Sequence, residues 1–166
     1  MTKENYPVTP AVRVLRQNGV AFEAHLYAYQ ERGGTALSAA LLGVDEHVVI
    51  KTIIMETENG APLVVLMHGD CEVSTQALAR ILGKKRITSC APDKAQKLTG
   101  YMVGGTSPLG TRTALPVYAE RTILNLPLIY INGGKRGFLV SFAPEEIKKV
   151  LKIEEIEAAI AKGAAG

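Results

Sequence analysis

The chain has 166 residues, 47% of them hydrophobic and 21% charged, which is enough to form one globular domain with its own core. Its two cysteines, Cys71 and Cys90, exclude a disulfide framework and the usual paired-cysteine zinc sites. The sequence has no apolar run of about 18 residues and no hydrophobic signal core at its start, so we expect a cytoplasmic protein without a membrane partner.

Charge is distributed unevenly along the chain. Residues 1–83 carry 6 Lys/Arg and 9 Asp/Glu, whereas residues 84–166 carry 13 and 7. A basic half is typical of proteins that contact phosphates, although a solubilising surface gives the same pattern. There is no Trp, and only 6 Tyr and 3 Phe, so sequence-specific reading of single-stranded nucleic acid is not indicated, and DNA is not an expected partner.

Capping residues, glycines and β-branched runs mark the expected elements of the first half. In chain order these are a helix over 9–19, a strand over 22–29, a helix over 35–42, and two strands over 48–55 and 63–67. Asn59-Gly60 separates the last two, and this dipeptide is a strong hairpin signal because both turn residues tolerate positive φ.

Helices and strands are also expected to alternate in the second half of the chain. The pattern there predicts a helix over 74–82, a strand over 86–89, a helix over 92–98, strands over 116–118, 128–131 and 138–142, and a charged helical segment from Pro144 onwards. Residues 162–166 are expected to be a frayed tail. Without repeats or linkers, residues 1–166 are predicted to form a single α+β domain, a mixed sheet covered by helices.

Lys51 is the first candidate for chemistry. In a strand over 48–55, Val49, Lys51, Ile53 and Met55 share one face, so the lysine has apolar neighbours. A buried ammonium has a lowered pKa and is useful in a site. The alternative is that Lys51 lies at a sheet edge and extends its charge into water.

Two glycine-rich segments are further candidates. Residues 104–110 (GGTSPLG) form a loop whose amides could bind a ligand oxygen, or a plain turn. Residues 133–137 (GGKRG) place two cations on a flexible backbone, which could meet phosphate or be an exposed hairpin loop. Neither matches a serine-hydrolase elbow or a Walker loop.

The histidines predict no conventional catalytic or metal centre. His25, His47 and His68 are scattered, and 68–71 (HGDC) is more typical of a turn with a helix cap than of a metal site. No Ser/His/Asp set or paired carboxylates can be assembled. We therefore expect no metal.

Taken together, five segments resemble the YbaK-type aminoacyl-tRNA deacylases, relatives of the editing domain of bacterial prolyl-tRNA synthetases. The matching segments are TPAV at 9–12, HLY at 25–27, VIKT at 49–52, TGYMVGGTSPLG at 99–110 and IYINGGKRG at 129–137. The resemblance implies a mixed, strongly curved, barrel-like sheet surrounded by helices. It also implies removal of wrongly attached amino acids from tRNA, without a metal or organic cofactor, with Cys-tRNA(Pro) the best-known substrate and prolyl-tRNA synthetase a partner.

The resemblance also implies residue roles. Lys51 matches the catalytic lysine and Tyr27 a pocket tyrosine. The implied substrate-binding residues are Gly104, Gly105, Thr106, Ser107, Pro108, Leu109, Gly110, Asn132, Gly133 and Gly134, and Lys135 and Arg136 are implied tRNA contacts. For cysteine esters the family is thought to let the substrate thiol attack its own ester, giving a thiolactone, with hydrolysis as the other route.

Asn132 and Leu139 stand where the best-studied cysteine deacylases carry Ser and Asp. The phenylalanine that those proteins have between Tyr27 and Gly43 is also missing here. A catalytically silent tRNA- or synthetase-binding module on the same scaffold is therefore the alternative function.

Overall fold

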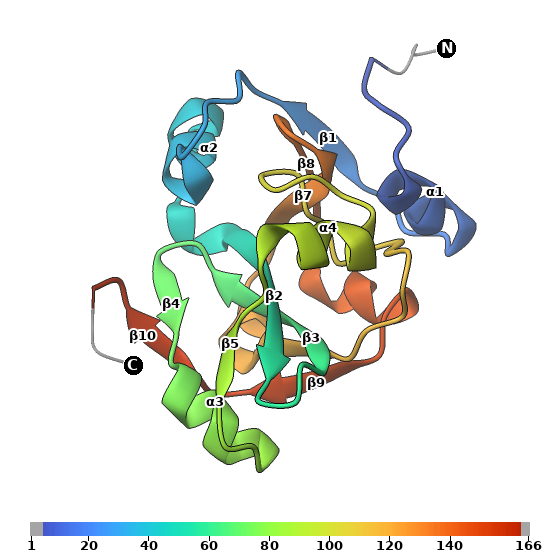
Figure 1. Cartoon of the computed structure of the whole chain (residues 1–166). Coiled ribbons are helices and arrows are strands. Elements are labelled where there is room, and N and C mark those ends of the chain that lie inside the picture. The colour runs from blue at the N-terminus through green and yellow to red at the C-terminus, as the bar shows by residue number, and fades with distance from the viewer. Residues whose placement is uncertain (1–4, 164–166) are drawn as a thin grey trace.

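The structure is a computed structural model that describes residues 5–163 and combines one large sheet with flanking helices (Figure 1). The strands of the large sheet are β1 (Glu23–Leu26), β2 (Val49–Thr57), β3 (Pro62–His68), β5 (Ile87–Ser89), β6 (Val117–Glu120), β7 (Ile129–Lys135), β8 (Phe138–Phe142) and β9 (Ile153–Ile156). Their order is β1-β8-β7-β2-β3-β6-β9, and β5 pairs with β2. The β2–β7, β3–β6 and β6–β9 pairs are parallel and the others antiparallel, which confirms the predicted mixed sheet. Over the described residues the sheet does not close into a barrel.

The helices are short and have local start and stop signals. They are α1 (Pro10–Gln17), α2 (Gly34–Leu42), α3 (Thr75–Leu82) and α4 (Pro92–Thr99), with 3₁₀ turns η1 (Glu46–Val48), η2 (Arg121–Asn125) and η3 (Pro144–Lys149). The Thr9 hydroxyl caps α1 by accepting from the Val12 amide, and Ser74 caps α3 in the same way. Gly83 ends α3 in the left-handed conformation, as the sequence predicts.

The predicted hairpin at Asn59-Gly60 is confirmed as the β2–β3 pair. Gly60 has φ +76°, and its amide bonds the Thr57 carbonyl at 2.9 Å. The register places Lys51 opposite Met67 and Ile50 opposite His68. This hairpin lies at the centre of the sheet, and β3 is buried from Leu63 to His68, whereas β2 is only partly buried at residues 51–53.

The two faces of β2 pack into different parts of the core. Ile50 and Ile54 belong to the large cluster under α1, whereas Val49 belongs to a small cluster with α2 and Met55 to one with α3. Lys51 lies on the second face, between those two small clusters. The predicted sharing of faces is thus confirmed.

The C-terminal region differs from the expected helix. After η3 the chain forms β9, and then β10 (Ala159–Ala161), which pairs antiparallel with the unpredicted β4 (Cys71–Val73). Only Pro144–Lys149 is helical, as a 3₁₀ segment, because later residues pair with β6 and β4. Of the tail expected to fray, Lys162 ion-pairs with Glu46 at 2.6 Å, and residues 164–166 lie outside the described part. Within residues 5–163, no helix is long and apolar enough to cross a membrane.

Candidate functional site

A cavity of about 560 Å³ lies against the middle of β2. Its walls come from α2 and the loop before it, from β2, from the start of α4, and from the tips of the 104–110 loop and β7. The apolar walls include Leu37, Ile50, Ile53 and Val103, and a few polar side chains converge between them. This composition is typical of a small-molecule site.

Lys51 lies in this cavity and half of its side chain is buried. Within residues 5–163 its ammonium forms no hydrogen bond and no ion pair. Burial lowers the Lys51 pKa, and the charge of Lys162 lowers it further, while Glu72 and Glu46 act in the opposite direction. An unpaired, partly desolvated ammonium is poised to bind an anionic or carbonyl oxygen. β2 is an interior strand, but its side opposite β3 is paired only at residues 49–50 and 55–57. Lys51 therefore lies on an unpaired stretch of β2 that lines the cavity, and not on an outer strand of the sheet.

Thr52 adds a second unsatisfied group to the same strand. Its hydroxyl oxygen is buried and has no hydrogen-bond partner among the described residues, although Thr52 lines the cavity. Buried hydroxyls normally have partners, so the Thr52 hydroxyl is an exception among the described residues.

The cavity lining holds no carboxylate and no histidine within the described chain. Its one thiol, Cys90, is partly buried, and desolvation together with its hydrogen bond to Glu56 raises its pKa to about 11. That thiol is therefore protonated near neutral pH and is a poor nucleophile. The cations Lys51 and Arg32 make the lining net positive. The site can orient and stabilise an anionic transition state, but its lining offers no ready base or nucleophile.

Asn132 joins the two glycine-rich segments at the cavity. Its side-chain amide donates to the Gly104 carbonyl at 3.1 Å, and its carbonyl oxygen accepts from the Gly134 amide at 2.7 Å. Gly104 has φ +89°, and a Cβ there would collide with the Tyr29 hydroxyl. Only glycine therefore lets this loop approach the tyrosine closely.

The residues of the 104–110 loop fall into two groups, those that line the cavity and those that pack behind it. Gly104 and Thr106 line the cavity, as do Lys51, Tyr27 and Asn132. The rest of the loop packs inward and supports it: Gly105, Ser107, Pro108 and Leu109 are buried, and Gly110 lies against the Pro10 backbone. The loop residues expected to bind substrate therefore divide into two that line the cavity and five that pack behind it.

Gly133 and Gly134 belong to β7 and are not an exposed hairpin loop. A Cβ on Gly133 would meet the Phe138 ring at 2.5 Å, and one on Gly134 would meet Tyr101 at 2.7 Å. A register shift between Asn132 and Lys135 marks a bulge in the β7–β8 pair. These glycines allow close packing behind the cavity.

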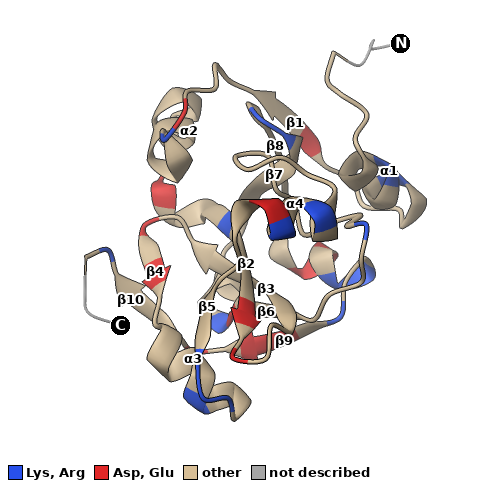
Figure 2. Ribbon diagram, viewed as in Figure 1, with Lys and Arg blue, Asp and Glu red and all other residues tan. Residues whose placement is uncertain are grey.

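Lys135 and Arg136 are exposed at the end of the same hairpin. Arg136 donates from Nε to the Val103 carbonyl at 2.8 Å and lies 5.2 Å from the centre of the Tyr29 ring, so it holds the glycine loop in place. Figure 2 shows the basic residues spread over α1, α4, this hairpin and the segment after α3. The basic half of the sequence therefore does not form one patch in that view.

Sequence reasoning missed several cavity residues, among them Tyr29, Arg32 and Thr35. Arg32 has φ +63°, which is uncommon for a residue other than glycine and marks a constrained turn before α2. The neighbouring Gly33-Gly34 pair was the available signal. Thr35 donates to Glu46 Oε2 at 2.7 Å, and Lys162 contacts the same oxygen, which ties α2 to the C-terminal segment.

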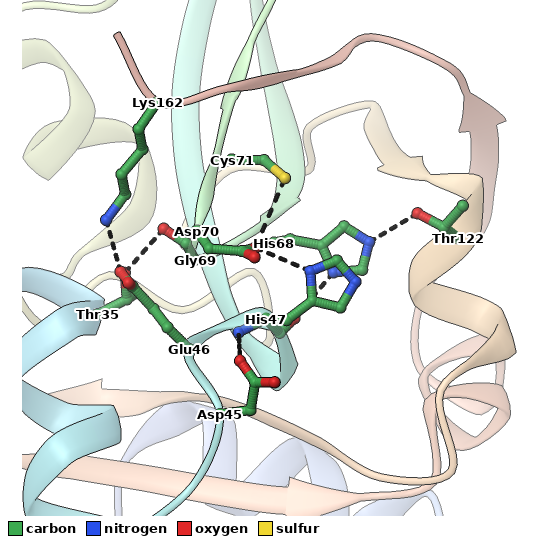
Figure 3. A network of polar contacts seen from close by, with 10 residues as sticks. All are labelled: Thr35, Asp45, Glu46, His47, His68, Gly69, Asp70, Cys71, Thr122 and Lys162. Carbon is green, nitrogen blue, oxygen red and sulfur yellow. Dashed lines mark hydrogen bonds and ion pairs between the residues drawn. The ribbon is translucent and has the colours of Figure 1, made fainter.

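A polar network lies beside the cavity at the β3–β4 turn (Figure 3). His68 is 1% exposed, and its Nδ1 lies 2.8 Å from the His47 carbonyl, an acceptor that requires the proton on Nδ1. Its Nε2 then accepts from the Thr122 hydroxyl at 2.7 Å. The His47 and His68 rings stack 3.8 Å apart, and His47 Nδ1 also contacts Asp70. Both nitrogens of His68 are therefore used structurally.

Comparisons with known proteins agree on one family. Residues 33–150 match the family described as the aminoacyl-tRNA editing domain. A protein of Enterococcus faecalis, named as a candidate Cys-tRNA(Pro)/Cys-tRNA(Cys) deacylase, is 29% identical over 146 residues, which cover 87% of this chain and 89% of that protein. A proline–tRNA ligase of Syntrophotalea carbinolica is 38% identical over 71 residues, 43% of this chain but only 12% of the ligase.

Two solved structures share the fold. A protein described only as hypothetical superimposes with a TM-score of 0.83 at 23% identity, covering 92% of this chain and all of that one. A candidate trans-editing enzyme for prolyl-tRNA synthetase superimposes with a TM-score of 0.75 at 21% identity, covering 91% and 99% of the two chains.

Proposed function

The chain belongs to the aminoacyl-tRNA editing domain family, whose members are aminoacyl-tRNA deacylases, and from this premise we propose that it acts in trans to clear mischarged tRNA, with Cys-tRNA(Pro) as its substrate. The similarity to the Enterococcus faecalis protein supports the cysteinyl substrate. The ligase similarity supports tRNA(Pro) as the carrier and prolyl-tRNA synthetase as a partner. The proposed reaction takes place in the cytoplasm.

One observation carries the mechanism: an unpaired ammonium lies in an apolar cavity whose lining, over residues 5–163, lacks a carboxylate, a histidine and an activated thiol. A substrate that brings its own nucleophile suits such a site. The cysteinyl thiol attacks its own ester carbonyl, so that an S–C bond forms and the C–O bond to the terminal ribose breaks. The products are a four-membered thiolactone and free tRNA. Positioning of the thiol next to the ester replaces conventional nucleophilic catalysis.

Lys51 has two roles in this proposal. Its ammonium stabilises the negative charge that develops on the ester oxygens, and its lowered pKa makes it a better proton donor to the leaving ribose oxygen. The proton lost by the substrate thiol restores the ammonium. No metal takes part in these steps. The cavity side of Gly104 supplies additional polar contacts.

The test is a panel of cysteinyl-, alanyl- and seryl-tRNA(Pro), with release of tRNA and the chemical form of the product measured. We expect rapid release from cysteinyl-tRNA(Pro) only, with a thiolactone trapped by an added amine, and loss of release in Lys51→Ala. Free cysteine as the first product would reject the cyclisation and favour hydrolysis. Salt-dependent tRNA binding without release from any ester would reject the enzyme and favour the silent binding module, to which the departures Asn132 and Leu139 point.

A further inference from the structure

His47, Asp70 and Cys71 bring a nitrogen, an oxygen and a sulfur atom together next to the cavity, although none of the three lines it. Their ligand-type atoms lie within 4.8 Å of one another. His47 Nδ1 is 2.8 Å from Asp70 Oδ1, and Cys71 Sγ is 3.5 Å from the same oxygen (Figure 3). Because His47 lies 23 residues before Asp70, sequence spacing could not show this cluster.

The spacing of these atoms fits one face of a tetrahedral zinc site. With Zn–S near 2.3 Å and Zn–N and Zn–O near 2.0–2.2 Å, a tetrahedral ion holds its ligand atoms about 3.3–3.7 Å apart. The Cys71–Asp70 separation falls inside that range and the His47–Asp70 separation lies below it, so small side-chain rotations suffice. Imidazole, carboxylate and thiolate together favour zinc over magnesium or calcium, which prefer oxygen ligands alone.

The backbone holds the three side chains in place before any ion binds. His47 lies in η1, where its amide donates to the Asp45 carboxylate at 3.0 Å and its carbonyl is bound by the buried His68. The β3–β4 turn is packed tightly on η1, since a Cβ at Gly69 would meet the carbonyl oxygens of Val49 at 2.6 Å and Glu46 at 2.7 Å. A preorganised site loses little entropy on binding.

Without a metal ion, two hydrogen bonds to Asp70 Oδ1 hold the cluster together. The imidazole N–H of His47 and the thiol of Cys71 both point at Asp70 Oδ1, in the position that a shared cation would take. We propose that His47, Asp70 and Cys71 form a binding site for one zinc ion, with the fourth position open to water. The thiol proton leaves to solvent when the ion binds, and neutral His47 carries its proton on Nε2.

The proposal is tested on the full-length reduced protein after chelator treatment, by titration with Co²⁺ and then Zn²⁺. We expect one Co²⁺ per chain with a thiolate-to-cobalt charge-transfer band in the near ultraviolet, and displacement of that band by one equivalent of Zn²⁺. Loss of an outer-shell partner alone weakens metal binding by about 10–100-fold, so Cys71→Ser, His47→Ala and Asp70→Asn should each weaken Zn²⁺ binding at least about tenfold.

Cys90→Ser is the matched control, because it removes the other cysteine while leaving the cluster intact. It should keep the band and the affinity. Circular dichroism spectra of all variants verify folding. A wild-type protein without the thiolate band, a band that disappears in Cys90→Ser, or unchanged Zn²⁺ affinity in folded His47→Ala and Asp70→Asn would each overturn the site. The readout does not involve tRNA, so its failure leaves the proposed deacylase function untouched.

Discussion

Lys51 and His68 lie on neighbouring central strands, one residue apart in register, and their surroundings are opposite. Each ring nitrogen of His68 has a partner at 2.7–2.8 Å, and its ring stacks on His47. The Lys51 ammonium and the buried Thr52 hydroxyl have no hydrogen-bond partner among the described residues. Burial without a partner destabilises a fold, so such groups persist where they contact something else. In the proposed function, the satisfied His68 belongs to the architecture and the unpaired Lys51 ammonium acts on the substrate.

The largest expected effect is the separation of activity from stability at Lys51. Lys51→Met keeps the length of the side chain and removes its charge, so kcat/KM on cysteinyl-tRNA(Pro) should fall at least about 100-fold, the scale of losing one transition-state contact. The unfolding midpoint in urea should stay the same or rise, because a desolvated charge is gone. A variant that loses both activity and stability would mean that Lys51 has a structural partner, as His68 does.

His68→Ala should give the reverse result. It removes a buried ring and leaves the His47 carbonyl and Thr122 hydroxyl without their partner, so the free energy of unfolding should fall by about 2–4 kcal/mol. Deacylation per folded molecule should persist, since His68 does not line the cavity. Chemical denaturation measures the first quantity and active-site-normalised kinetics the second. Wild-type stability in this variant would contradict the structural role.

Thr52→Val tests the orphan hydroxyl with a shape-matched side chain. Removal of a buried, unbonded oxygen should leave the free energy of unfolding unchanged or raise it by up to about 1 kcal/mol. If the hydroxyl binds substrate, kcat/KM should fall by roughly tenfold. The corresponding substitution at an exposed threonine outside the cavity, Thr88→Val, serves as the control for both measurements. A marked loss of stability in Thr52→Val would show that the hydroxyl has a partner in the folded protein.

The smallest effect is a pH dependence of stability. Burial lowers the Lys51 pKa below the ordinary 10.5, so between those two values the unfolded chain binds more protons than the folded chain. The free energy of unfolding of the wild type, relative to Lys51→Met, should therefore rise as the pH rises through the folded pKa towards about 10.5. Urea titrations of both proteins across this window measure the difference. If the difference in free energy of unfolding between the two proteins did not depend on pH, the lowered pKa of Lys51 would be contradicted.

Local signals made much of the fold predictable. The Asn59-Gly60 turn needs positive φ, and Thr9 and Ser74 are helix caps, so each element follows from a few adjacent residues. The C-terminal region could not be predicted in this way, because β9 and β10 are short and depend on distant partners, β6 and β4. Charged residues after Pro144 resemble a helix when those partners are unknown.

In the candidate site, too, residues with a local sequence signal were predictable and those that depend on distant partners were not. Lys51 was predictable because a lysine in a β-branched run violates the apolar pattern of a central strand. Which glycines face the cavity was not, since that depends on the Asn132 hydrogen bonds that join two distant loops. Arg32 and the His47–Asp70 contact were missed for the same reason: neither has a local sequence pattern that reveals its spatial neighbours.

The β4–β10 pair also bears on how this protein could misassemble. β4 has β10 as its strand partner, and β10 consists of only three residues, Ala159–Ala161. Detachment of so short a strand would break the Lys162–Glu46 ion pair. It would also leave the backbone amides of β4 as an unpaired edge that can pair with another chain. A chain shortened before residue 159 would accordingly be prone to self-association by strand addition at β4, which lies outside the large sheet and its edge strands β1 and β9.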